Sequence, residues 1–127
     1  MIGSEETTRV LVVDDERIIA DTLVTIFVQA GYEARAVYSA EAALALAEAW
    51  IPDMAILDVY LPGMNGVDLA IRLKAELPDC RMTLFSGQSS TSDLLEKARN
   101  NGHALDIISK PVHPAELLSL LASFRVH

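Results

Sequence analysis

The sequence predicts an α/β fold, a doubly wound sheet of five parallel strands that alternate with five helices. Two observations support this prediction. Short apolar runs alternate along the whole chain with longer segments in which apolar residues recur at helical spacing. In addition, four apolar runs are each followed by a charged or hydroxyl residue. Parallel strands present such residues together at the carboxyl edge of their sheet, where open α/β sheets bind ligands.

The first half of the chain contains three expected strands and two expected helices. Arg9–Val13 is a nearly continuous run of Val and Leu, which is typical of a strand buried on both faces. Residues 15–30 have apolar positions at helical spacing, and Gly31 ends this helix. The other elements expected here are a more exposed strand over residues 32–38, an Ala-rich helix capped by Ser39 and running to about Ala49, and a strand over residues 53–57.

The second half continues the same alternation. The turn-rich sequence Pro62-Gly63-Met64-Asn65-Gly66 leads into a helix over about residues 67–77, which Pro78 ends. Further on we expect a strand over residues 81–85, a helix from Thr91 or Ser92 through Asn100, a strand over residues 104–108 and a last helix over residues 114–124. The chain has neither an internal repeat nor a linker, so we expect one domain over residues 9–127 after a flexible leader over residues 1–8.

Composition narrows the classes of function. At 127 residues the chain fits one domain with a sizeable core, and a hydrophobic fraction of 51% argues against disorder. No stretch approaches the roughly 18 apolar residues of a membrane span, and the acidic N-terminus lacks an apolar signal core. The net charge of -8 argues against direct binding to nucleic acid. A single cysteine, Cys80, cannot form an internal disulfide, which fits a reducing cytoplasm.

Five polar side chains are expected to meet at the carboxyl edge of the sheet. They are Asp14 and Asp15 after the first strand, Asp58 after the third, Ser86 after the fourth and Lys110 after the fifth. Two carboxylates about 4 Å apart repel each other by roughly 4 kcal/mol at an effective dielectric constant of about 20. Three such groups take up a proton or hold a cation, and Mg2+ fits because it accepts a few oxygen ligands and bridges to phosphate. These residue types together indicate a phosphoryl-transfer site.

Each of these residues also has an ordinary structural explanation. Asp14 and Asp15 can cap the first helix, and for this pair alone that explanation is favoured. Asp58 and Ser86 can be turn residues, and Lys110 can be a solvated surface charge. Together these explanations need a coincidence at the ends of four separate strands, so the joint functional explanation is preferred.

From Arg9 onward, the order of these residues resembles the receiver domain of two-component response regulators. The matching segments are Asp14-Asp15, Asp58, Leu61-Pro62-Gly63-Met64-Asn65-Gly66, Ser86-Gly87 and Lys110-Pro111. Each segment alone is a weak match, whereas all of them in order at successive strand ends are highly specific. The resemblance implies a flavodoxin-like receiver fold with strand order 2-1-3-4-5, which would place strands one and three side by side.

The resemblance also implies a metal site and a phosphoacceptor. Asp15, Asp58 and the backbone carbonyl of Tyr60 would bind Mg2+, while Asp14 would act largely through water. Asp58 would be the nucleophile that takes a phosphoryl group from the phosphohistidine of a histidine kinase or phosphotransfer protein. The chain would then be a cytoplasmic signalling receiver that catalyses its own phosphorylation and dephosphorylation and switches partner binding, rather than an enzyme.

By the same resemblance, the remaining site residues would contact the phosphoryl oxygens. Lys110 would pair with Asp58 before transfer and with a phosphoryl oxygen afterwards. Ser86 would donate its hydroxyl to another oxygen, and the backbone amides of Val59 and Gly87 would supply further donors. Positioning and charge neutralisation would then carry most of the transfer.

One position of this chain departs from the family pattern. Ile107 stands three residues before Lys110, where the family often has a Tyr or Phe whose ring swings inward on activation. We therefore expect a weaker or differently wired switch.

The family's usual partner face, formed by the fourth helix, fifth strand and fifth helix, would permit a homodimer. The chain ends at His127, so it either acts alone on a downstream partner or lacks the output domain of a longer regulator or hybrid kinase.

Three other classes of protein share parts of this pattern. A phosphatase of the haloacid dehalogenase type also uses a strand-end aspartate, but it needs a second acid two residues later, where this chain has Tyr60. A flavodoxin-like electron carrier needs a phosphate-holding loop after the first strand, where Asp14-Asp15-Glu16 would repel phosphate. A pseudo-receiver that binds partners independently of phosphate is the strongest alternative, although it usually lacks one of the acids or the lysine.

Overall fold

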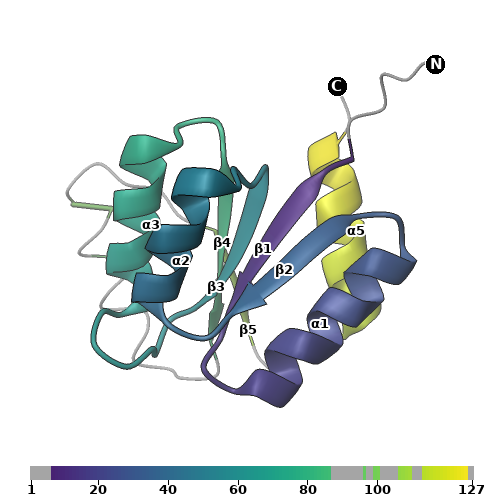
Figure 1. Cartoon of the computed structure of the whole chain (residues 1–127), viewed down its shortest axis with the longest axis horizontal. Coiled ribbons are helices and arrows are strands. Elements are labelled where there is room, and N and C mark those ends of the chain that lie inside the picture. Colours follow the sequence, from purple (N-terminus) through teal and green to yellow (C-terminus); the bar gives the residue numbers. More distant parts are fainter. Residues whose placement is uncertain (1–6, 87–95, 97–98, 101–105, 110–112, 126–127) are drawn as a thin grey trace.

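The computed structural model describes residues 7–86, 96, 99–100, 106–109 and 113–125. Within this part of the chain, five strands form a single parallel sheet with helices on both faces (Figure 1). One face is covered by α1 (Arg17–Gln29) and α5 (Pro114–Arg125), and the other by α2 (Ala40–Ala49) and α3 (Gly66–Glu76). The doubly wound α/β fold expected from the sequence is confirmed.

The strands follow the order β2-β1-β3-β4-β5, and every neighbouring pair is parallel. Their bounds are β1 (Arg9–Val13), β2 (Glu33–Val37), β3 (Met54–Asp58), β4 (Arg81–Ser86) and β5 (Asp106–Ser109). The expected strand order is therefore confirmed. It places β1 and β3 side by side, with Val13 opposite Leu57, so the residues that follow these two strands emerge next to each other.

Four of the five expected helices lie within the described residues. α1 begins at Arg17 rather than at residue 15, because Glu16 has an extended backbone and acts as the N-cap. Gly31 follows the end of α1 with a φ of 100°, in the left-handed region that glycine adopts readily. The helix expected from Thr91 or Ser92 lies mostly outside the described residues, although Glu96, Arg99 and Asn100 are helical.

α2 and α3 begin at side-chain caps. The Ser39 hydroxyl oxygen accepts a hydrogen bond from the Ala42 N–H at 3.1 Å. The Asn65 Oδ1 accepts one from the Asp68 N–H at 2.8 Å, so α3 begins at Gly66, one residue earlier than expected. Each cap satisfies a backbone donor that the first turn of a helix leaves unpaired. The start of α3 is thereby fixed immediately after the turn that leaves β3.

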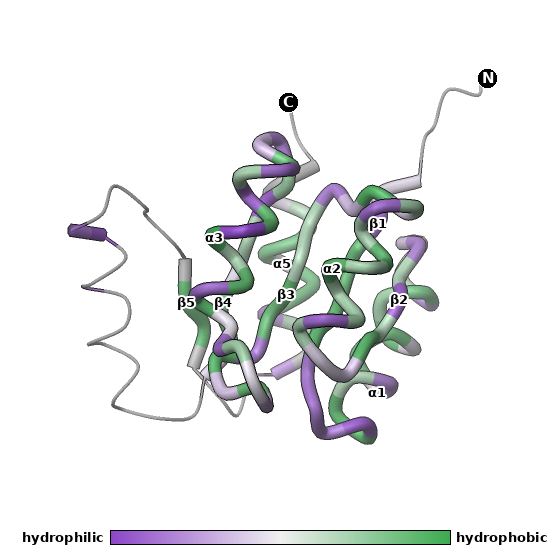
Figure 2. Tube along the Cα trace, turned by 60° about the vertical axis from the view of Figure 1, so that its left-hand side comes forward, coloured by the Kyte–Doolittle hydropathy of each residue, from purple (hydrophilic) through white to green (hydrophobic). Residues whose placement is uncertain are grey.

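The sheet separates two hydrophobic cores. Leu11 and Leu57 belong to the core under α2 and α3, whereas Val12 and Ile56 belong to the core under α1 and α5. Because successive residues of a strand point to opposite faces, a strand buried on both faces needs apolar residues throughout. Figure 2 shows this as largely hydrophobic colouring along β1 and β3 and mixed colouring along the helices. None of the described helices is long and apolar enough to cross a membrane.

Cys80, just before β4, belongs to the first of these cores and is only 2% exposed. Its burial raises the pKa of the thiol to about 12. The side chain therefore stays protonated near neutral pH and acts as a small core residue.

Candidate functional site

Three carboxylates meet at the carboxyl edge of the sheet. Asp14 and Asp15 follow β1, and Asp58 is the last residue of the neighbouring β3. One oxygen from each carboxylate lies within 4.8 Å of the other two. Asp14 and Asp58 are buried, with exposures of 1% and 6%, whereas Asp15 is exposed. The structure thus brings together the three acids that the sequence placed at two different strand ends.

The orientation of Asp14 is fixed by two hydrogen bonds. Its backbone N–H donates to the Val37 carbonyl at 3.2 Å, which continues the pairing between β1 and β2 past the end of the strand. Its Oδ1 accepts from the Glu16 N–H at 2.9 Å. This second bond makes a tight turn over residues 14–16 and holds the carboxyl group next to the start of α1.

The backbone of Asp58 is fixed by the segment that follows it. The Val59 N–H donates to the Phe85 carbonyl at 3.3 Å, and the Gly66 N–H donates to the Val59 carbonyl at 2.7 Å. A Cβ on Gly66 would overlap the Asp58 carbonyl and lie 2.9 Å from the Val59 Cα, so only glycine fits here. The sequence indicated Gly66 only as a turn residue, because a close backbone approach leaves no periodic signal.

The other expected site residues are placed only in part. Ser86 is the last residue of β4, is 5% exposed and lies at the same edge of the sheet as Asp58. Tyr60, two residues after Asp58, has a side chain that is 40% exposed. Lys110 and Gly87 lie outside the described residues. The Val59 N–H already donates to Phe85, so a phosphoryl oxygen would have to share or replace that bond.

The donor set fits a hard divalent cation. Carboxylates at this spacing repel one another by roughly 4 kcal/mol per pair at an effective dielectric constant of about 20. Two of the three are buried, where solvation by water cannot offset this repulsion. Oxygen ligands of this kind, with room left for water, are what Mg2+ prefers in proteins. The cluster can therefore hold one Mg2+ ion between Asp14, Asp15 and Asp58.

A group of side chains that the sequence did not indicate joins the start of α1 to the residue after β2. The Tyr38 hydroxyl donates a 2.6 Å hydrogen bond to Asp21 Oδ1, and the Arg17 guanidinium carbon lies 4.1 Å from the centroid of the Tyr38 ring. Tyr38 directly follows β2, whereas Arg17 and Asp21 are in α1. Arg17 and Asp21 are exposed and Tyr38 is half-buried, and contacts between residues so far apart in the sequence leave no pattern in composition or spacing.

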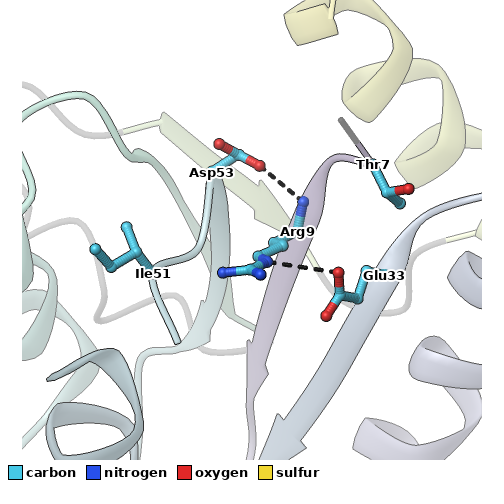
Figure 3. A pocket seen from close by; sticks show the side chains of 5 residues that line it. All are labelled: Thr7, Arg9, Glu33, Ile51 and Asp53. Atoms are coloured by element: carbon cyan, nitrogen blue, oxygen red, sulfur yellow. Dashed lines mark hydrogen bonds and ion pairs between the residues drawn. The ribbon is translucent and has the colours of Figure 1, made fainter. Parts of the chain in front are cut away.

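A separate hollow of about 400 Å3 lies at the opposite, amino edge of the sheet (Figure 3). Its lining residues are Thr7, Arg9, Glu33, Ile51 and Asp53. The Arg9 Nε pairs with Glu33 Oε1 at 3.4 Å, and the Arg9 backbone N–H donates to Asp53 Oδ2 at 2.8 Å. Because these polar groups satisfy one another and none is near the acidic cluster, we do not assign the site to this hollow.

Comparisons with known proteins show which sequences and folds this chain resembles. Residues 10–122 match the family model of the response regulator receiver domain. The DNA-binding response regulator MtrA of Mycobacterium tuberculosis is 31% identical over 111 residues, which cover 87% of this chain and 47% of that protein. The transcriptional regulatory protein HptR of Staphylococcus aureus is 34% identical over 116 residues, which cover 89% of this chain and 44% of that protein. The chain therefore spans about half the length of these curated relatives.

Solved structures show the same architecture over nearly the whole chain. A CheY-like response regulator receiver domain protein from Methanospirillum hungatei superposes with a TM-score of 0.84 at 30% identity and covers 93% of both chains. The receiver domain of NtrX from Brucella abortus superposes with a TM-score of 0.78 at 30% identity, covering 91% of this chain and 96% of that chain.

Proposed function

This chain belongs to the response regulator receiver domain family, and on that premise we propose that it is the phosphoacceptor of a two-component phosphorelay. In this proposal Asp58 takes a phosphoryl group from the phosphohistidine of a histidine kinase or phosphotransfer protein. The observation that carries the proposal is the grouping of three carboxylate oxygens within 4.8 Å at the ends of β1 and β3. Such a group is unfavourable by itself and becomes favourable when it shares a cation.

The three acids have different roles in the proposed transfer. An Asp58 carboxylate oxygen forms the new bond to phosphorus while the bond from phosphorus to the histidine nitrogen breaks, and the electron pair of that bond returns to the imidazole. Asp15, Asp58 and the Tyr60 carbonyl would hold Mg2+, with Asp14 acting largely through water. The bound cation would neutralise negative charge on the carboxylates and on the phosphoryl oxygens. The Glu16 N–H keeps the Asp14 carboxyl group in place for this role.

The remaining groups would stabilise the transferred phosphoryl group. Ser86 is at the end of β4, next to β3, where its hydroxyl would donate to a phosphoryl oxygen. Lys110 follows the last residue of β5 in sequence and would supply a positive charge. The amides of Val59 and Gly87 would complete the set of donors, the first of them by giving up or sharing its bond to Phe85. Positioned donors and charge neutralisation are the main contributions that proteins make to phosphoryl transfer.

The partners proposed for the chain follow from its family. A cytoplasmic receiver of this kind would take its phosphoryl group from a histidine kinase or phosphotransfer protein. It would then act on a downstream protein or on an output domain in a longer chain. The relatives named as a DNA-binding response regulator and a transcriptional regulatory protein are about twice as long as the matched region, which supports the second arrangement. A homodimer through the face that contains β5 and α5 is part of the same proposal.

Labelling with a small phosphodonor tests the proposed function. We expect acetyl phosphate or phosphoramidate with Mg2+ to give a phosphoryl adduct by mass spectrometry, and we expect EDTA to prevent it. Asp58→Asn should give no adduct. Asp53→Asn, which changes an aspartate just before the opposite end of β3, should label like the wild type. Absence of labelling in the wild type would favour the phosphate-independent pseudo-receiver, and labelling of Asp58→Asn to the same extent as the wild type would exclude Asp58 as the acceptor.

A further inference from the structure

The side chains of Arg17, Asp21 and Tyr38 link the start of α1 to the end of β2. Arg17 is the first residue of α1, and its guanidinium lies over the Tyr38 ring at 4.1 Å from the centroid. The Tyr38 hydroxyl donates to Asp21 Oδ1, one turn further along α1, at 2.6 Å. A cation over an aromatic face and a hydrogen bond to a carboxylate are both attractive contacts, so the two segments are held together at this point.

The same two segments are also joined on the other side of the turn that carries the acids. The Asp14 N–H donates to the carbonyl of Val37, the residue immediately before Tyr38. The segment of residues 14–17 is therefore attached to the end of β2 at both of its ends, through Asp14 and through Arg17. Inside this closed loop the Glu16 N–H donates to Asp14 Oδ1. A short segment that is tied at both ends has few alternative conformations.

Repulsion within the acidic cluster would displace this loop if its ends were not held. Asp15 is the exposed member of the cluster and lies within the loop, whereas Asp14 and Asp58 are buried. Repulsion between carboxylates about 4 Å apart is between roughly 1 kcal/mol in water and 4 kcal/mol at an intermediate dielectric constant. When no cation is bound, this repulsion pushes Asp15 outward, and the contacts at both ends of the turn oppose that movement. A turn that moved outward would have to be reordered before an ion could bind, which would weaken binding.

We propose that Arg17, Asp21 and Tyr38 form a brace that holds the Asp14-Asp15 turn in its ion-binding conformation when no cation is bound. The three are positioning residues, because they act on the cluster through the backbone of the turn. The brace rests on the proposed function only in that the cluster binds Mg2+. The hydrogen bond to Asp21 raises the pKa of Tyr38, so the phenol keeps its proton and the bond persists at neutral pH.

Replacing Tyr38 by Leu removes both contacts of the brace without changing the charge of the protein. Mg2+ binding is followed through the NMR amide shifts of Asp14, Asp15 and Asp58. We expect the dissociation constant of Tyr38→Leu to rise by about threefold to tenfold, because only part of the free energy of the lost cation–π contact and hydrogen bond is transmitted to the turn. In Mg2+-free protein, we expect the Glu16 amide to exchange with solvent several times faster, because its bond to Asp14 opens more often.

Two further variants complete the experiment. Tyr38→Phe keeps the ring under Arg17 but loses the hydroxyl, and we expect a smaller increase of the dissociation constant. Thr25→Ala is the matched control, because it removes a different hydrogen bond of α1, from the Thr25 hydroxyl to the Asp21 carbonyl at 3.0 Å. Its dissociation constant for Mg2+ and its Glu16 exchange rate should equal those of the wild type. Urea denaturation of all variants separates an effect on the cluster from a general loss of stability.

The brace is overturned if folded Tyr38→Leu binds Mg2+ within about twofold of the wild type, which is too small a shift for a lost conformational preference. An unchanged exchange rate at Glu16 overturns it equally. If Tyr38→Leu does not fold, Tyr38→Phe decides instead, and no measurable weakening of Mg2+ binding rejects the brace. Failure of the proposed Mg2+ site looks different, because the wild type itself would then show no Mg2+-dependent shifts at the three aspartates, and failure of phosphorylation alone would appear only in the labelling experiment.

Discussion

A single residue without a side chain sets the position of the proposed phosphoacceptor. Gly66 begins α3, and its backbone lies directly against the carbonyl of Asp58 and the Cα of Val59. A 2.7 Å hydrogen bond from the Gly66 N–H to the Val59 carbonyl holds the two backbone segments together. Because the neighbouring atoms belong to the backbone of β3 and the residue after it, they cannot move aside as a flexible side chain would. The backbone position from which the Asp58 carboxylate extends therefore depends on residue 66.

Replacing Gly66 by Ala is expected to displace the end of β3 and to lower the free energy of unfolding by roughly 1–3 kcal/mol, the usual cost of overpacking. Labelling of Asp58 by acetyl phosphate should fall strongly at the same time. Gly31→Ala is the matched control, because its Cβ would enter open space and only its positive φ would be strained, at a cost of roughly 1–2 kcal/mol. This control should lose stability in urea but keep its labelling rate, and equal labelling of both variants would show that residue 66 does not position Asp58.

Strand β5 contains Ile107, the position at which this chain departs from the usual receiver pattern. It is the edge strand beside β4, and its Ile107 is 42% exposed. Receivers often have an aromatic residue at this position, whose ring moves inward on activation. An isoleucine is branched at Cβ and has no planar ring, so it cannot make the same movement. We therefore propose that the signal leaves the site by another route, through the segment after Ser86 or the helix expected from Thr91 or Ser92.

Side-chain methyl signals in NMR spectra test this route. We expect Ile107 to keep its rotamer after phosphorylation, with shift changes no larger than those of Ile108, its half-buried neighbour on the same strand. The largest changes should instead fall on residues that follow β4. The Asp58→Asn variant cannot be phosphorylated at residue 58. Adding the same phosphodonor to it therefore gives the shift changes that do not depend on phosphorylation. A large shift at Ile107 together with a new rotamer would restore the ordinary switch.

At the scale of the whole molecule, most of the fold could be predicted from the sequence because the central strands are buried on both faces. The apolar runs of β1 and β3 are continuous for this reason, and helical spacing between strands then requires a parallel sheet. Hydrophobic periodicity does not predict the order of the strands, which was expected instead from the resemblance to receiver domains. The start of α1 was placed two residues early, because the turn in which Asp14 accepts from the Glu16 N–H is not visible in an apolar pattern.

The grouping of the three acids in the candidate site could also be predicted from the sheet topology. Residues that follow neighbouring parallel strands must emerge at one edge, so topology alone brings Asp14 and Asp15 near Asp58. The contact between Arg17 and Tyr38 depends instead on the side-chain conformations of an exposed arginine and a half-buried tyrosine, which no spacing rule determines. Lys110 and Gly87 lie outside the described residues, and their roles stay predictions.

The central claim is that Asp14, Asp15 and Asp58 share one divalent cation, and thermal unfolding with EDTA or with Mg2+ tests it most directly. We expect Mg2+ to raise the midpoint of the wild type, because an ion that binds only the folded state stabilises it. In EDTA, Asp15→Asn should be more stable than the wild type by about 1 kcal/mol, since one repelling carboxylate is gone. The same variant should lose most of the stabilisation by Mg2+, whereas Glu48→Gln, an exposed change on α2, should keep it. Equal stabilisation of Asp15→Asn and the wild type by Mg2+ would contradict a shared ion.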